Sequence, residues 1–104
     1  MIENEIRTLL DAPAAGGQAP SLAHIEDTLT AGYARALALE AERWRLERRM
    51  AEVVTAFADE EDAVNSSELT RLARRLKRAS GDLADLRSLL ASLRQRAAEV
   101  RAVA

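Results

Sequence analysis

Hydrophobic side chains recur every three or four residues along the last part of the chain, from Asn65 to Ala104. One set of positions, spaced by seven, is Leu69, Leu76, Leu83, Leu90, Ala97 and Ala104. The other set, also spaced by seven, is Leu72, Ala79, Leu86, Leu93 and Val100. No charged residue interrupts either set, and this a/d pattern is typical of a helix that packs along another helix. We therefore predict a long helix over about residues 67–103.

The middle of the chain carries a second pattern of the same kind. Its positions are Leu22, Ile25, Leu29, Gly32, Ala36, Leu39, Arg43, Leu46, Met50, Val53 and Phe57. Ser21 directly precedes it, where a hydroxyl can cap the first turn of a helix. The pattern predicts a helix over about 22–61 and a turn over about 59–66. Asn65 and Glu68 have the spacing of a capping box at the start of the next helix.

Two helices of similar length joined by a short connection pack as antiparallel neighbours. The predicted fold is therefore all-α, an antiparallel coiled-coil helical hairpin over residues 21–104. Folding at the turn would place Ala36 opposite Leu90 and Gly32 opposite Leu93, so that small residues meet large ones.

Flanking charges agree with this register on one side of the hairpin and disagree on the other. Glu26 would face Arg101 and Glu40 would face Arg87, which are favourable pairs. On the other side the expected pairs carry like charge: Arg49 with Arg75, and Glu42 with Asp82. We expect that a second chain could supply the missing counter-charges.

The N-terminus forms a separate short amphipathic helix over residues 1–11. Ile2, Ile6, Leu9 and Leu10 fall at i, i+4, i+7 and i+8, on one helix face. A helix of about 10 residues is marginal alone in water, so it needs a surface to pack against. Residues 12–20 hold two prolines and two adjacent glycines, which predict a flexible linker. The short helix can therefore dock on its own hairpin or on a neighbour's.

A further apolar stripe on the first long helix lies outside the hairpin seam. It consists of Tyr33, Leu37, Ala41, Trp44, Ala51 and Val54. In a lone hairpin these side chains would be exposed, and an exposed line of Trp, Tyr and Leu usually marks an interface. The predicted interface residues are Tyr33, Leu37, Ala41, Trp44, Val54, Ile2, Ile6, Leu9 and Leu10. We expect two hairpins to associate into a homodimeric four-helix bundle.

Composition excludes several classes of protein. The net charge of −2 does not favour nucleic acid or a membrane surface as partner, and the absence of cysteine excludes disulfide scaffolds and thiolate sites. No stretch approaches the ~20 apolar residues of a membrane span, and the acidic N-terminus lacks the features of a signal peptide. We expect a single-domain, soluble, cytoplasmic protein that does not contact the membrane.

No arrangement of polar residues predicts catalysis, a metal or a cofactor. His24 is the single histidine, and the Glu-x-x-His motif of di-iron bundles is absent. Glu40, Glu47 and Glu52 would serve acid–base chemistry only if they were buried together. We interpret His24 as a surface side chain and Glu40 and Glu47 as register-setting charges, and we predict that the protein is not an enzyme.

Charged residues suggest two other roles. Arg43 interrupts the apolar seam level with Leu83, near Asp82 and Asp85, and polar residues at such positions fix register or oligomeric state. An anion or nucleotide site at a dimer interface is the alternative. Arg71, Arg74, Arg75, Lys77 and Arg78 form a basic cluster, which we interpret as spread over most of the exposed helix surface and solvated. The alternative is a docking patch for an acidic partner. Residues 1–64 carry 6 basic and 13 acidic groups, and residues 65–104 carry 9 and 4.

The stretch Asp82-Leu83-Ala84-Asp85-Leu86-Arg87-Ser88-Leu89-Leu90 is similar in its leucine spacing to the coiled-coil anti-sigma factors that bind cyclic di-GMP. Arg87 fits that family's dinucleotide-reading positions, whereas the rest of the polar set is not present. The resemblance implies a ligand-responsive regulator.

Together these patterns predict a non-enzymatic protein–protein interaction module: an adaptor, a chaperone-like binder or a regulator that acts through helix packing. The alternative is an anti-sigma-like regulator, or one that binds a nucleotide or nucleic acid through the arginine cluster. Its partners would be a second copy of the chain and another protein.

Overall fold

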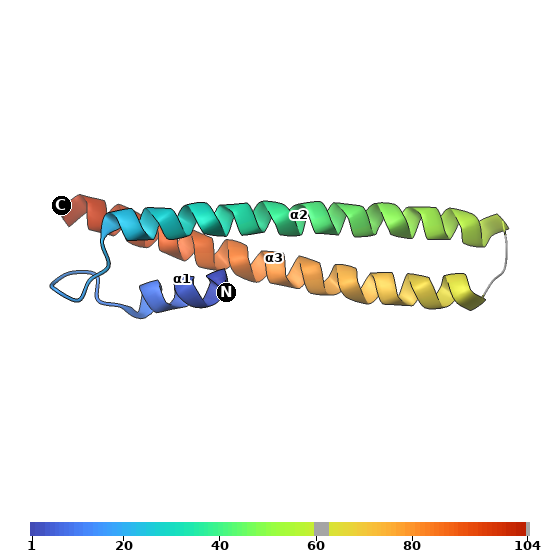
Figure 1. Cartoon of the computed structure of the whole chain (residues 1–104), viewed down its shortest axis with the longest axis horizontal. Helices are drawn as coiled ribbons and strands as arrows, with labels where there is room; N and C mark the ends of the chain where they lie inside the picture. The colour runs from blue at the N-terminus through green and yellow to red at the C-terminus, as the bar shows by residue number, and fades with distance from the viewer. Residues whose placement is uncertain (60–62, 104) are drawn as a thin grey trace. The chain divides into compact units, whose positions relative to one another are not determined.

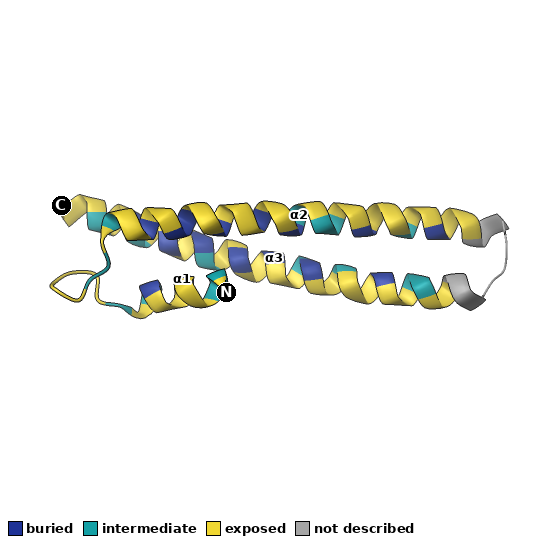
Figure 2. Ribbon diagram, viewed as in Figure 1, coloured by how far each residue is buried: buried dark blue, intermediate teal, exposed yellow. Residues whose placement is uncertain are grey.

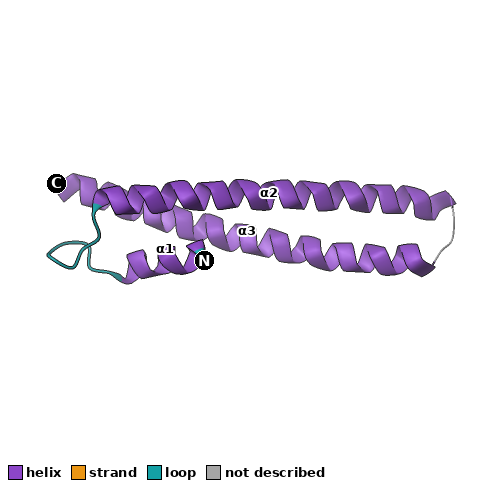
Figure 3. Ribbon diagram, viewed as in Figure 1, coloured by secondary structure: helices purple, strands orange, loops and turns teal. Residues whose placement is uncertain are grey.

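The chain folds into three helices joined by two connections (Figures 1 and 3). The computed structural model describes residues 1–59 and 63–103, with side chains given outside 57–65. Helix α1 spans Ile2–Asp11, α2 spans Leu22–Asp59 and α3 spans Ala63–Val103. No strand is present in those ranges. The two long helices pack against each other, so the predicted all-α helical hairpin is confirmed.

The start of α2 follows the capping chemistry expected from the sequence. The backbone N–H of His24 donates to the Ser21 hydroxyl oxygen at 3.1 Å, and the N–H of Ile25 donates to the Ser21 carbonyl at 3.1 Å. A serine oxygen at this position satisfies a backbone donor that the first helical turn leaves without a partner. Ser21 is therefore the N-cap of α2.

The hairpin divides into two compact units. Unit 1 comprises residues 1–37 and 84–104, and contains α1, the start of α2 and the end of α3. Unit 2 comprises residues 38–83 and contains the rest of the two long helices. In both units the described seam positions are buried or half-buried and most intervening positions are exposed, as the alternation of colours along each ribbon shows (Figure 2).

Unit 1 has a three-helix core. Ile6 of α1 and Ile25 of α2 are fully or almost fully buried, as are Leu86, Leu93 and Ala97 of α3. Close approach of the helices depends on Gly32, because a Cβ at this position would come within 2.5 Å of Leu90 Cδ2 and 3.5 Å of Ile6 Cδ1. The predicted ion pair between Glu26 and Arg101 is confirmed, with an N–O distance of 3.0 Å.

Unit 2 has a two-helix core. Its centre is formed by Leu46, Val53, Leu72 and Ala79, with Met50, Leu69 and Leu76 packed around them. These residues come from the two predicted seams, so the assignment of both seams is confirmed here. The side chain of Phe57, the last residue of the first predicted seam, lies outside the described residues.

The start of the second long helix differs from the prediction. Helix α3 begins at Ala63, four residues before the expected start, so Asn65 lies inside the helix and is not its cap. Gly32 lies against Leu90, and Leu93, its expected neighbour, is fully buried in the same unit.

Candidate interaction surfaces

Large apolar side chains of α2 are exposed to solvent in both units. In unit 1, Tyr33 is 41% exposed and Leu37 is 66% exposed. In unit 2, Trp44 is 57% exposed and Val54 is 52% exposed, and Ala41 is also exposed. These five residues were predicted to lie outside the seam, and each of them does. Soluble proteins scatter single apolar residues over their surface, but a tryptophan in line with other apolar residues needs an explanation.

The exposed side of α2 in unit 2 follows a heptad pattern of its own. Ala41, Trp44, Arg48, Ala51 and Thr55 are separated by three, four, three and four residues, and all five are exposed. This spacing places them on one face of the helix, opposite the buried side chains of Leu46 and Val53. We call this set of five residues the outer face of α2.

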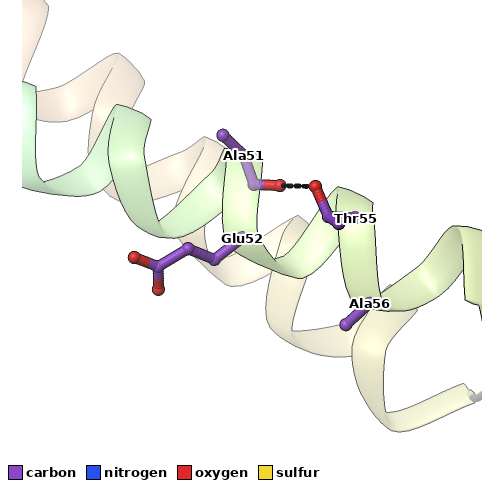
Figure 4. A pocket seen from close by; sticks show the side chains of 4 residues that line it. All are labelled: Ala51, Glu52, Thr55 and Ala56. Carbon is purple, nitrogen blue, oxygen red and sulfur yellow. Dashed lines mark hydrogen bonds between the residues drawn. The ribbon is translucent and has the colours of Figure 1, made fainter.

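The outer face combines the projecting indole ring of Trp44 with an open depression, called the hollow below. The Arg48 guanidinium carbon lies 4.8 Å from the centre of the Trp44 ring, a cation–π contact that holds the indole over its own helix. About two to three turns beyond Trp44, Ala51, Glu52, Thr55 and Ala56 line a shallow depression (Figure 4). The Thr55 hydroxyl donates to the Ala51 carbonyl at 2.9 Å, so the hydroxyl group in this hollow already has a hydrogen-bond partner.

The predicted interface residues of the N-terminal helix pack within their own chain. Ile6 is 0% exposed and Leu9 is 6% exposed, whereas Ile2 and Leu10 are half-buried. Arg96 of α3 holds the C-terminal end of α1, because its Nη1 donates to the Ala12 carbonyl at 3.0 Å and its Nη2 to the Leu10 carbonyl at 3.1 Å. A cation at the last carbonyls of a helix also complements the helix dipole. Tyr33 and Leu37 remain exposed beside this docked helix.

Arg43, which was expected near Asp82, has its ion-pair partner on its own helix. Its Nε lies 3.9 Å from Glu47 Oε1, one turn along the same helix, and the Arg43 side chain is 36% exposed. A pair of this type in solvent contributes only ~0.3–0.5 kcal/mol, so it sets register weakly. The arginine can therefore stand in the seam because its charged head extends along α2 towards water.

Arg49 finds its counter-charge inside the chain. Its Nη2 lies 2.7 Å from Glu68 Oε1 on α3, and its Nη1 lies 3.4 Å from Glu52 Oε2. The hydrogen bond with Glu68, followed by the charge of Glu68, raises the pKa of Arg49. The like-charge pairing of Arg49 with Arg75 predicted from the sequence is therefore wrong, and no second chain is needed to neutralise Arg49.

The other predicted like-charge pair, Glu42 with Asp82, lies at a small cleft between the two helices of unit 2. Leu39, Glu42, Arg75, Arg78, Ala79 and Asp82 line this cleft, whose volume is about 90 Å³. Neither Glu42 nor Asp82 has an ion-pair partner within the described ranges. Two carboxylates and two guanidinium groups therefore surround one cleft without pairing.

Four arginines of the basic cluster share one face of α3, which the sequence analysis missed. Arg71, Arg74, Arg75 and Arg78 have the spacing i, i+3, i+4 and i+7, whereas Lys77 falls off this face. We call these four residues the arginine stripe. The interpretation that the cluster covers most of the exposed surface is wrong for them, because reading heptad letters one by one obscured a single-face spacing.

The described residues contain no group of three or more His, Asp or Glu side chains that could hold a metal ion. His24 is exposed and lines an open depression with residues of α1, including Asn4, Glu5 and Thr8. Glu40 is half-buried and Glu47 and Glu52 are exposed, so the three carboxylates are not buried together. We find no helix, over the residues described, with an apolar stretch long enough to cross a bilayer.

Comparison of the chain with known protein families, curated proteins and solved structures finds no match. Two surfaces of unit 2, the outer face of α2 and the arginine stripe of α3, are therefore the features from which a function can be inferred.

Proposed function

We propose that this protein is a non-enzymatic interaction module that binds through helix packing, and that its outer face of α2 pairs with the same face of a second copy. The observation that carries the proposal is the exposure of Trp44, 57% of which is open to solvent on a face with heptad spacing. Tryptophan is the residue type most enriched among side chains that dominate binding energy at protein interfaces.

A second copy suits this face because the face is complementary to itself. In a symmetric dimer the same patch is used by both subunits, so every projection must meet a hollow of its own kind. Trp44 projects, and the depression at Ala51, Glu52, Thr55 and Ala56 lies about two to three turns away on the same helix. Two antiparallel α2 helices related by a two-fold axis near Arg48 would place each indole over the other copy's hollow.

Small side chains and charges support the same arrangement. Ala41, Ala51 and Thr55 allow two helices to approach closely, and their spacing is that of a helix–helix seam. The two Arg48 side chains would meet near the proposed axis, where Glu47 and Glu52 of both copies lie within about one turn and supply the opposite charge. The hairpins would then contribute two helices each to a four-helix assembly.

Solution mass tests the proposal directly. We expect wild-type protein to have the mass of two chains at high concentration, and Trp44→Glu to have the mass of one chain, because a carboxylate cannot be buried in an apolar seam without large cost. Val103→Glu is the matched control, since Val103 is 76% exposed and lies at the end of α3. A wild-type monomer, or a Trp44→Glu dimer, would refute the pairing.

A further inference from the structure

The four arginines of the stripe have no ion-pair partner among the described residues, in contrast to four other arginines of the chain. Arg43, Arg49, Arg96 and Arg101 each form an ion pair with a carboxylate of the chain. By contrast, none of the four stripe arginines has an ion pair or a hydrogen-bonded side-chain partner within the described residues. All four are exposed.

Four unpaired guanidinium groups on one helix face disfavour the folded protein. Like charges three or four residues apart on a helix repel each other, and the stripe contains four such pairs, because Arg71 and Arg78 each neighbour both Arg74 and Arg75. Among the described side chains of unit 2, none forms an ion pair with these four arginines. A surface that works against the stability of its own fold is a strong candidate for a surface that acts through a ligand.

We propose that the arginine stripe is a docking site for an acidic α-helical segment of a partner protein. The four charges extend over about 10 Å of helix, given a rise of ~1.5 Å per residue. A partner helix with carboxylates at i, i+3, i+4 and i+7 presents the same length and spacing. Arginine suits such a partner, because its planar fork binds a carboxylate through two parallel hydrogen bonds.

The end of the stripe sets a limit on the ligand. Arg75 and Arg78 share their cleft with Glu42 and Asp82, so the positive surface stops there and turns negative. A uniformly negative polymer would be repelled at this point, whereas a helix whose acidic run is followed by a basic residue would match both signs. The cleft therefore also orients the partner along α3.

The same observations disfavour nucleic acid as the occupant. The three aromatic residues of the chain, Tyr33, Trp44 and Phe57, belong to α2, so the stripe has none on which a base could stack. The chain as a whole has a net charge of −2, and the basic surface is short. A duplex reader normally presents a longer basic surface on a basic domain.

Binding of synthetic peptides tests the site. The probe is a helical peptide with glutamates at i, i+3, i+4 and i+7 and a lysine one turn beyond; its control is a peptide of the same composition with glutamates spread around the helix. We expect the full chain to bind the first peptide more tightly than the second, with affinity that falls as salt rises. Arg74→Glu/Arg75→Glu should weaken binding at least about tenfold.

The variant needs a control for charge and one for folding. Arg45→Glu/Arg94→Glu changes the net charge equally at exposed positions outside the stripe and should bind almost as wild type. Arg74→Gln/Arg75→Gln removes charge without reversing it, and should also lose binding while its melting temperature rises, because repulsion within the stripe is relieved. Equal peptide binding by the stripe and control variants would overturn the proposal, as would no binding by wild type. Tighter binding of a 20-nucleotide DNA than of the peptide would also overturn it, in favour of a nucleic-acid site.

Discussion

Glycine stands at two positions inside the long helices, and the surroundings of the two differ. Gly32 of α2 is packed against Leu90 and Ile6, and a Cβ there would come within 2.5 Å of Leu90 Cδ2. Gly81 of α3 has no atom within 4 Å of the place where its Cβ would stand. The first glycine therefore permits close helix packing, whereas the second lowers helix stability without any contact to justify it.

Alanine substitutions should separate these two effects. Gly81→Ala should raise the free energy of unfolding by about 0.5–1 kcal/mol, the usual difference in helix propensity. Gly32→Ala should lower it by about 1 kcal/mol, because overpacking of the buried Leu90 costs ~1–3 kcal/mol and exceeds the gain in propensity. Urea unfolding of the two variants measures both values. Equal stabilisation by both substitutions would show that the α2–α3 contact at Gly32 is looser than described.

The partner of each charged residue was the hardest feature to predict from the sequence. Arg49 was placed opposite Arg75, yet its long side chain reaches Glu68 on α3 and Glu52 on its own helix. An arginine side chain is long enough to bind any of several carboxylates near it. A prediction that pairs only the residues directly opposite each other in the register does not take this length into account. The exposure of Trp44 was predicted correctly, because it depends only on which face of α2 the residue occupies.

At the scale of elements, the docking of α1 depends on one side chain of α3. Arg96 donates to the carbonyls of Leu10 and Ala12, and Ile6 and Leu9 fill the apolar contact. A helix of this length is not stable alone, so its structure and its docking should be lost together.

Replacement of Arg96 should therefore release α1 selectively. In Arg96→Met the aliphatic packing is kept, but two hydrogen bonds from a charged donor, each worth about 1.5–3 kcal/mol, are lost. We expect amide hydrogen exchange of residues 2–11 to approach that of an unfolded peptide, while the amides of α2 and α3 in unit 2 keep their protection. Arg94→Met, at an exposed position on the same helix, is the control. Retained protection in α1 would contradict this role of Arg96.

The helices followed from the sequence more closely than the start of α3 did. Apolar spacing predicted both seams and the short first helix, because burial of one helix face imposes that spacing directly. The ion pair between Glu26 and Arg101 agrees with the predicted register. A repeating seam offers nearly equivalent contacts after a shift of one turn, so the apolar pattern alone does not fix where α3 begins, and it begins earlier than its capping residues suggested.

The molecule as a whole is a helical scaffold that carries two exposed surfaces of different chemistry. The outer face of α2 is built of Trp44 and small side chains, and the arginine stripe of α3 is built of charge. Both lie in unit 2, and its two-helix core is filled by seam residues alone. The residues of both surfaces are exposed, which is the arrangement expected of a module whose activity is binding.

The pairing of two outer faces is the central claim, and the absence of cysteine from the chain allows a direct test. Arg48→Cys places one thiol per chain at the proposed two-fold axis, and Arg94→Cys places one at an exposed position of α3 as control. Each variant is treated with a short bis-maleimide at a concentration where random collisions are rare, and the products are separated on a denaturing gel. The account predicts a cross-linked dimer in high yield from Arg48→Cys and little from Arg94→Cys. Equal low yields from the two variants, or a higher yield from Arg94→Cys, would contradict the pairing.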